Sequence, residues 1–219
     1  MDVSVVIPCL NAARTLPATL CSLGEIADCI VVDGGSTDGT REFAHRSGVR
    51  VLSSPKGRGT QLACGIAAAS HPWLLLLHAD TRLSFGWEQA ARVHSETRPH
   101  KAGWFRFVLD STSVRARQLE YAVAWRSRVL GLPFGDQGLL VHRTVLTEVG
   151  GMRPLPLMED VDLVRRLGRA RLVPLAADAI TSAEKWEREG WIRRSLRNQA
   201  CLAMYLAGVA PERLVRFYG

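Results

Sequence analysis

The chain has 219 residues, 47% hydrophobic and 22% charged, with a formal net charge of +7. This length suits one α/β domain, and the composition excludes a disordered, fibrous or repeat-built protein. Lysine supplies only three of the 28 basic residues. The arginine guanidinium suits phosphate and carboxylate, so the charge fits an anionic ligand, a nucleic acid or an anionic membrane face. No basic run is interleaved with aromatic residues, and we expect no nucleic-acid partner.

The cysteines and the apolar runs indicate the compartment. The five cysteines lack CxxC spacing and lie mostly in apolar segments, which predicts reduced core residues. The longest strongly apolar run, residues 73–77, is far shorter than the ~20 residues that span a bilayer. The sequence also opens without a leader pattern. We expect a cytoplasmic protein, with peripheral attachment at the inner face of the membrane as the alternative.

The first hundred residues alternate short apolar runs with helical patterns. Strands are predicted at residues 3–7, 29–32, 50–52 and 73–77, and helices after Asn11, at 40–46, from Gly59 to about Ser70, and near 86–97. This alternation predicts parallel strands with helices on both faces. Asn11, Asp33 and Asp80 each follow a strand, and ligands bind beyond the carboxyl ends of such strands. We therefore expect these three side chains at one edge.

The second half is less regular. It predicts strands at 103–109 and 139–142, a glycine-rich turn at 131–138, and helices at 115–130, 158–167 and 191–206. The last helix is expected to expose Arg193, Arg194 and Arg197 on its polar side. Together the elements predict an α/β fold, with a mostly parallel central sheet and helices on both faces, as a single domain over residues 1–219.

Four segments carry the strongest functional signal: VSVVIPCLN, VVDGGSTDGT, KGRGTQLACGIAAA and LLLLHADT. In this order they resemble the nucleotide-binding half of glycosyltransferase family 2, and the resemblance covers about residues 3–168. It implies a GT-A type fold, in which residues 1–100 bind the nucleotide sugar and residues 101–219 bind the acceptor. It also implies a bacterial inverting glycosyltransferase that uses a nucleotide-diphosphate sugar, a UDP-sugar by family frequency, and an unknown hydroxyl acceptor.

The resemblance assigns the donor side of the site. Asp33 would read the nucleotide base; alternatively Asp33, Ser36 and Asp38 form only turn and cap bonds. We favour base binding for Asp33 and capping for Asp38. The remaining nucleotide-binding candidates are Pro8, Asn11, Lys56, Arg58 and Ala79.

The motif His78-Ala79-Asp80 occupies the place of the family's acidic metal-binding motif. Asp80 offers a hard oxygen ligand for Mg²⁺ or Mn²⁺, which would bridge it to the diphosphate. His78 replaces an aspartate and would serve as a second ligand or bind phosphate. The alternative for Asp80 is a helix cap.

Residues 158–162 resemble the family's acceptor-side acidic motif. By that resemblance Asp160 is the general base that takes the proton of the acceptor hydroxyl. Glu159 would bind the acceptor or orient Asp160, while Asp162 fits an exposed charge face of the helix. Asp136 and Gln137, between two glycines, are predicted to bind the sugar or the acceptor.

Other parts of the sequence leave alternatives open. Trp186 and Trp191 are assigned to core packing ahead of sugar stacking or a lid. For the C-terminal helix we favour packing on the sheet; contact with an anionic membrane and a homodimer contact are the alternatives. A sugar nucleotidyltransferase should carry a GxGxR-type loop after the first strand, which this chain lacks. A non-catalytic nucleotide-sugar-binding or scaffold protein is the other alternative, because His78 replaces an acidic residue.

Overall fold

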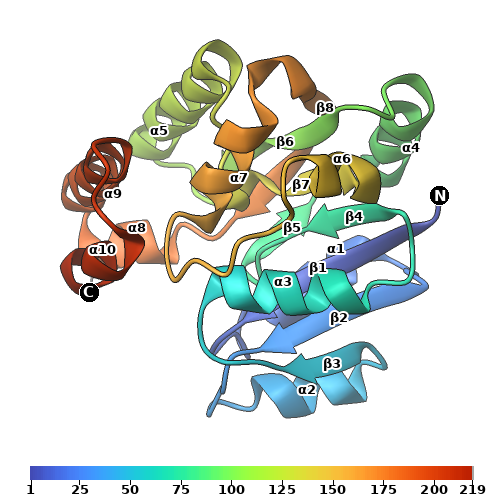
Figure 1. The fold of residues 1–219 in the computed structure, drawn as a ribbon. Helices are drawn as coiled ribbons and strands as arrows, with labels where there is room; N and C mark the ends of the chain where they lie inside the picture. Colours follow the sequence, from blue (N-terminus) through green and yellow to red (C-terminus); the bar gives the residue numbers. More distant parts are fainter. Residues whose placement is uncertain (219) are drawn as a thin grey trace.

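The computed structural model describes residues 1–218, with the side chains of residues 1–217, as an eight-stranded sheet covered by helices on both faces (Figure 1). The strand order is β3-β2-β1-β4-β7-β6-β8-β5. The strands are β1 (Val3–Cys9), β2 (Asp28–Asp33), β3 (Arg50–Ser53), β4 (Trp73–Leu76), β5 (Thr81–Leu83), β6 (Ala102–Leu109), β7 (Leu139–His142) and β8 (Leu172–Thr181).

The helices connect these strands and extend the C-terminal half. They are α1 (Leu16–Leu23), α2 (Thr40–Arg46), α3 (Arg58–Ala68), α4 (Trp87–Thr97), α5 (Val114–Trp125), α6 (Arg143–Glu148), α7 (Glu159–Leu167), α8 (Glu184–Glu189), α9 (Trp191–Leu206) and α10 (Pro211–Tyr218). Three short segments, η1 (Arg126–Leu130), η2 (Gly135–Gln137) and η3 (Arg169–Arg171), have π- or 3₁₀-helical geometry. Within residues 1–218, no helix combines the length and the apolar character that a membrane crossing needs.

Strand direction divides the sheet into two parts. Strands β1 to β4 are mutually parallel in the order β3-β2-β1-β4, as the alternation of the first hundred residues predicts. Beyond them β7 runs antiparallel to both β4 and β6, while β8 pairs in parallel with β6 and antiparallel with β5. The fold class is therefore confirmed, and the sheet becomes mixed where the sequence pattern becomes irregular.

Alternating side chains of the strands build two cores. On β1, Val5 and Ile7 join a cluster with residues of α1, α2 and α4, whereas Val6 joins a cluster with residues of α3, α6 and α7. Successive side chains of a strand point to opposite faces, so each face of the sheet holds one cluster. A third cluster joins β6 to α5, with Trp186 and Trp191 packed against it. Core packing is thus confirmed for both tryptophans.

Several predicted boundaries were wrong. The predicted helix at 115–130 is α5 followed by the π-helical turn η1, and β1 continues through Pro8 to Cys9. Strand β4 pairs with β1 only as far as Val6, so Pro8 has a neighbouring strand only in β2. Strands β5 and β8 and helices α6, α8 and α10 were not predicted.

Candidate active site

Two loops at the carboxyl ends of β1 and β2 are tied together. Asn11, at φ 50°, accepts a hydrogen bond from the Thr37 N–H through Oδ1 at 2.9 Å, and its own N–H donates to Ser36 Oγ at 2.8 Å. A positive φ is uncommon for a residue other than glycine and often marks a functional loop. Asn11 therefore fixes the shape of both loops.

The carboxylates of the second loop hold its turn. Asp33, 3% exposed, accepts from the N–H groups of Gly35 and Ser36, both at 3.1 Å. Asp38 accepts from the N–H of Thr40, the first residue of α2, and from that of Ala13. Asp38 therefore forms turn bonds at the start of α2, whose N-cap is Gly39. Base binding by Asp33 stays a prediction, and it would use lone pairs that the turn leaves available.

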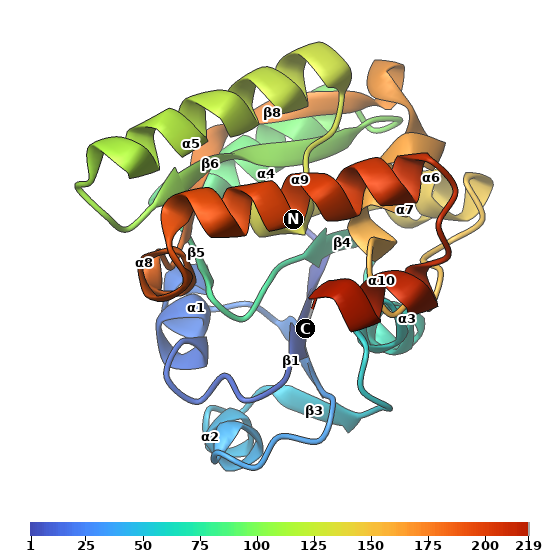
Figure 2. The ribbon, with the colours of Figure 1, turned by 90° about the vertical axis from the view of Figure 1, so that its left-hand side faces the viewer.

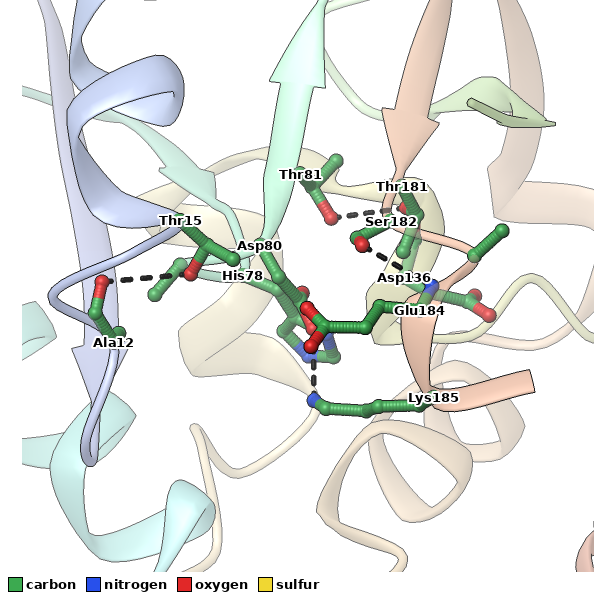
Figure 3. Close-up of polar contacts among 12 residues, drawn as sticks. Ala12, Thr15, His78, Asp80, Thr81, Asp136, Thr181, Ser182, Glu184 and Lys185 are labelled. Atoms are coloured by element: carbon green, nitrogen blue, oxygen red, sulfur yellow. Dashed lines mark hydrogen bonds and ion pairs between the residues drawn. The ribbon is translucent and has the colours of Figure 1, made fainter. Parts of the chain in front are cut away.

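The segment after β4 places His78 and Asp80 beside a lysine from a distant part of the chain. Lys185 Nζ, on α8, lies 2.9 Å from Asp80 Oδ2 (Figure 3). Burial alone would raise the pKa of Asp80, but Lys185 lowers it below its ordinary value. Burial and the Arg58 guanidinium lower the pKa of His78 to about 4. The imidazole is therefore neutral at pH 7.

Arg58, the first residue of α3, contacts two separate segments of the candidate site. Its Nη1 lies 3.5 Å from His78 Nε2, and its Nε lies 3.4 Å from Glu159 Oε1. Its side chain is 41% exposed, whereas that of Glu159 is 1% exposed. One guanidinium thus contacts the segment after β4 and the start of α7 while part of it faces solvent.

The acidic residues at the start of α7 differ in exposure and bonding. Met158, which precedes the helix, has φ 64° and turns the chain into it. Glu159 is buried, neither carboxylate oxygen has a hydrogen-bond partner in residues 1–218, and burial raises its pKa to about 7 against the effect of Arg58. Asp160 is partly exposed and accepts from the Gly135 N–H at 2.8 Å. Glu159 is therefore shielded from an acceptor, and Asp160 is not.

The turn η2 closes the site from the other side. A Cβ on Gly135 would lie 2.5 Å from His78 Nε2 and 3.2 Å from Asp160 Oδ2, so only glycine fits between these side chains. Burial raises the pKa of Asp136 to about 6, and its Oδ1 has no hydrogen-bond partner among the described residues. Such a group is a candidate for ligand contact.

The structure corrects the assignment of Gln137 to a substrate. Its side chain has no exposed surface. It accepts from Ser127 Oγ and the Phe134 N–H, and it donates to the Phe105 carbonyl. These three bonds use the amide to hold η2 against β6, so Gln137 does not face a ligand.

Two further charge assignments are also corrected. Asp162 is 6% exposed and pairs with Arg153 and Arg166, so it does not form an exposed charge face. Arg194 and Arg197 pair with Glu189 of α8 and are mostly covered. Of the three predicted arginines of α9, Arg193 is exposed and the other two are partly buried.

The remaining nucleotide-binding candidates lie around the same edge. Pro8 is buried in β1, Ala79 is 9% exposed with its carbonyl accepting from Thr19 Oγ1, and Lys56 is exposed on the loop before α3. Side-chain contact with a ligand is thus open to Lys56, whereas Pro8 and Ala79 offer chiefly backbone. Lys185 was missed altogether, since it lies 105 residues from Asp80 in the chain.

The donor set near Asp80 fits a divalent ion only in part. Within residues 1–218, no three His, Cys, Asp or Glu side chains are grouped as a metal site. Mg²⁺ is commonly held by one or two carboxylates together with substrate phosphates. Asp80 and the neutral imidazole of His78 therefore fit an ion whose other ligands come from a diphosphate.

Comparison with known sequences identifies the family. The sequence model described as Glycosyl transferase family 2 matches residues 4–147. An uncharacterised glycosyltransferase of Mycobacterium tuberculosis is 38% identical over 85 residues, covering 38% of this chain and 39% of that protein. A PGL/p-HBAD biosynthesis glycosyltransferase of the same organism is 32% identical over 126 residues, covering 51% and 49%. The chain thus spans only 39% and 49% of the lengths of these relatives.

Solved structures agree on the fold. Glucosyl-3-phosphoglycerate synthase from M. tuberculosis, in complex with Mn²⁺, UDP-glucose and phosphoglyceric acid, has a TM-score of 0.55 and 25% identity over 79% of this chain and 68% of its own. GalNAc-T7 with UDP, GalNAc and Mn²⁺ has a TM-score of 0.64 and 13% identity over 83% and 44%, a likeness of fold alone. Because the family match covers most of the sequence, the chain belongs to glycosyltransferase family 2.

Proposed function

We propose that the protein is an inverting glycosyltransferase that transfers a sugar from a nucleotide-diphosphate sugar to a hydroxyl acceptor. One observation carries the proposal: Asp80, His78, Arg58 and Asp160, from three separate segments, meet at the carboxyl edge of the sheet. The UDP-glucose and Mn²⁺ bound by the M. tuberculosis synthase support a UDP-sugar donor and a divalent ion here. The family match ends at residue 147, so the role of Asp160 rests on geometry.

In the proposed reaction Asp160 takes the proton of the acceptor hydroxyl. The acceptor oxygen forms a bond to the anomeric carbon while the bond from that carbon to the diphosphate oxygen breaks on the opposite face, which inverts the configuration. The nucleoside diphosphate leaves with the bonding electrons. The Gly135 N–H fixes one oxygen of Asp160, and exact placement of a general base typically contributes 10²–10⁴-fold in rate.

The cationic groups of the site act on the diphosphate. Arg58 stands at the start of α3, where the helix N-terminus also favours an anion. Asp80 and His78 would hold a divalent ion, which would neutralise negative charge on the leaving group. In the structure, the Asp80 carboxylate forms an ion pair with Lys185. A divalent ion at Asp80 would compete with Lys185 for this carboxylate, and the Lys185 ammonium would then be available to the same phosphates. Buried Glu159 holds Arg58 rather than the acceptor.

The proposal is tested by thermal unfolding with nucleoside diphosphates and their sugars, each with Mn²⁺, Mg²⁺ or EDTA. A ligand at a hundred times its Kd adds about 2.7 kcal/mol, which raises Tm by about 5–10 °C for a chain of this size. We expect one nucleotide to stabilise the protein in a metal-dependent manner, and Asp80→Ala to abolish the metal dependence. Asp2→Ala, a matched change of an exposed carboxylate outside the site, should keep it.

Two results would contradict the proposal. If no nucleotide stabilises the protein with any metal, the non-catalytic scaffold becomes the better description. If stabilisation is unchanged in Asp80→Ala, this carboxylate does not hold an ion. Transfer itself is assayed by release of nucleoside diphosphate, and the anomeric configuration of the product by NMR; retention of configuration would exclude the single displacement.

A further inference from the structure

Helices α5, α9 and α10 and the turn η1 form one face of the molecule, here named the basic helical face. In Figure 2, α5, α9 and α10 lie at the front, and in Figure 1 they occupy the left-hand side. Of the fourteen large apolar side chains exposed in the described part of the chain, ten belong to these elements. They are Val114, Tyr121, Trp125, Val129, Leu130, Ile192, Leu196, Leu206, Val215 and Phe217.

The exposed apolar residues follow helical spacing, so each long helix has two apolar sides. On α9, Ile192 and Leu196 are 66% and 62% exposed one turn apart, while Cys201 is buried on the inner side. On α5, Tyr121 and Trp125 are 78% and 58% exposed, again one turn apart. Residues four apart share one helix face. The outer sides therefore present parallel apolar stripes that no other part of the described chain covers.

The elements of this face are strongly basic, although Arg194 and Arg197 pair with Glu189 of α8. These elements contain nine arginines and only two acidic residues, Glu120 and Glu212. This excess equals the net charge of +7, and the rest of the chain has as many acidic as basic residues. Some of these arginines have partners within the chain, as Arg117 has in Glu120. Five exposed arginines have no ion pair in the described structure: Arg115, Arg128, Arg193, Arg213 and Arg216.

We propose that the basic helical face binds the surface of an anionic lipid bilayer. Amphipathic helices with arginine beside aromatic and aliphatic residues lie in the headgroup region, where apolar side chains enter the acyl boundary and cations contact lipid phosphates. A second copy of this chain is a poor partner, because it would oppose one basic face with another. The proposal goes beyond sugar transfer and does not depend on it.

Attachment through this face would hold the site next to the bilayer. Helix α9 follows α8, which carries Lys185 at Asp80, and Tyr205 near the end of α9 lies 3.5 Å from Asp162 of α7. The same helix thus contacts the elements that present both sides of the site. A docked α9 would place the site within reach of hydroxyl groups at the membrane surface.

The test is flotation of the whole protein with vesicles of phosphatidylcholine, with and without phosphatidylglycerol, at low and high salt. We expect binding to the anionic vesicles that weakens as salt rises, since counter-ions screen the arginines. The double variant Ile192→Asn/Leu196→Asn should lower the vesicle partition coefficient by about tenfold or more. Because both side chains are exposed, the Tm should stay that of the wild type.

Matched variants separate the contribution of the apolar side chains to vesicle binding from that of the arginines. Val93→Asn alters an exposed side chain of α4, on the other side of the molecule in Figure 1, and should bind vesicles like the wild type. Arg193→Gln/Arg213→Gln should reduce binding to anionic vesicles and its salt dependence. Absence of vesicle binding at low salt overturns the proposal. So does a wild-type dimer in sedimentation that dissociates in Ile192→Asn/Leu196→Asn, with no vesicle binding, because the face would then join two copies.

Discussion

Two buried carboxylates, one in each half of the molecule, differ in their hydrogen bonding. Asp28, 4% exposed at the start of β2, accepts hydrogen bonds from Ser4 Oγ, the Ser70 N–H and Arg50 Nη1. Burial would raise its pKa, but these donors lower it. Glu159, 1% exposed at the start of α7, lies 3.4 Å from Arg58 but has no hydrogen-bond partner elsewhere in the described chain, and burial raises its pKa to about 7.

This contrast teaches which carboxylates hold the fold and which serve the site. A buried charge that is fully hydrogen-bonded stabilises the native state, whereas an unsatisfied one costs free energy and persists for another reason. Asp28 ties three segments of the parallel half together. Glu159 and Asp136, both with raised pKa, surround Asp160 in the mixed half. Predictions can therefore be arranged by whether a variant loses activity or stability.

The largest effect is expected from Asp160→Asn. Loss of the general base should lower the rate of nucleoside-diphosphate release in the presence of acceptor by about 10²–10⁴-fold. Since the amide can still accept from the Gly135 N–H, the Tm and its increase with nucleotide and metal should be retained. The measurement is kcat with the donor and metal that the thermal screen selects.

Asp162→Asn is the control on the same helix. Asp162 is buried between Arg153 and Arg166, so this variant should lose stability but retain most of its activity once folded. If Asp160→Asn keeps its activity, or if Asp162→Asn loses as much at a temperature where both are folded, Asp160 is not the base.

The second effect concerns stability and compares Asp28→Asn with Glu159→Gln. Replacing Asp28 weakens three hydrogen bonds around a buried group and should lower the free energy of unfolding at pH 7 by about 2–3 kcal/mol. Its native pKa is lowered, so its contribution exists above the unfolded pKa and disappears as the pH falls through the native one. The Asp28→Asn loss should therefore shrink in acid. Urea unfolding measures both variants.

Glu159→Gln should lose less than about 1 kcal/mol at pH 7, because a neutral side chain avoids burial of charge. Its loss of activity should follow from the altered position of Arg58, which lies 3.4 Å from the carboxylate. Equal losses of stability in the two variants would show that the contrast in hydrogen bonding has no energetic consequence.

The sequence was most informative where local pattern decides structure. The four strands of the parallel half are short apolar runs, and the polar residues that follow them mark the edge that holds the site. Strand β8 was missed because its sequence, LVPLAADAIT, contains Pro174 and several alanines, which have weak strand propensity. Pairing with β5 and β6 stabilises β8 in the extended conformation that its own sequence favours only weakly.

The site residues that were missed or misassigned depend on long-range packing. Lys185 reaches Asp80 because β8 pairs with β5 and the Ser182 N–H donates to the Asp80 carbonyl. Nothing near Lys185 in the sequence indicates this neighbour. Gln137 and Asp136 are adjacent in η2. The conformation of η2 directs the Gln137 side chain to hydrogen-bonding groups of β6 and η1, and it leaves Asp136 Oδ1 without a hydrogen-bond partner in the described chain.

The smallest effect is expected from Asp136→Asn and concerns stability. Whether the variant gains or loses stability distinguishes a carboxylate that holds the fold from one that serves the site. Burial raises the native pKa of Asp136 to about 6 from an ordinary value of 3.8. Stability from the protonated form is complete below the unfolded pKa and is lost as the pH rises through about 6. The variant stays neutral, so it should be more stable than the wild type at pH 8 and equal to it near pH 4.

The check on Asp136→Asn is the free energy of unfolding from pH 4 to pH 8, with Asp2→Asn as an exposed control that should give a curve parallel to the wild type. If Asp136→Asn is also parallel to the wild type, the carboxylate is not held in an unfavourable state. If the variant gains stability and the KM for donor or acceptor rises, the wild-type chain retains a costly buried carboxylate because a ligand uses it. That outcome would extend the contrast between Asp28 and Glu159 to the residue beside Gln137 and identify η2 as part of the binding surface.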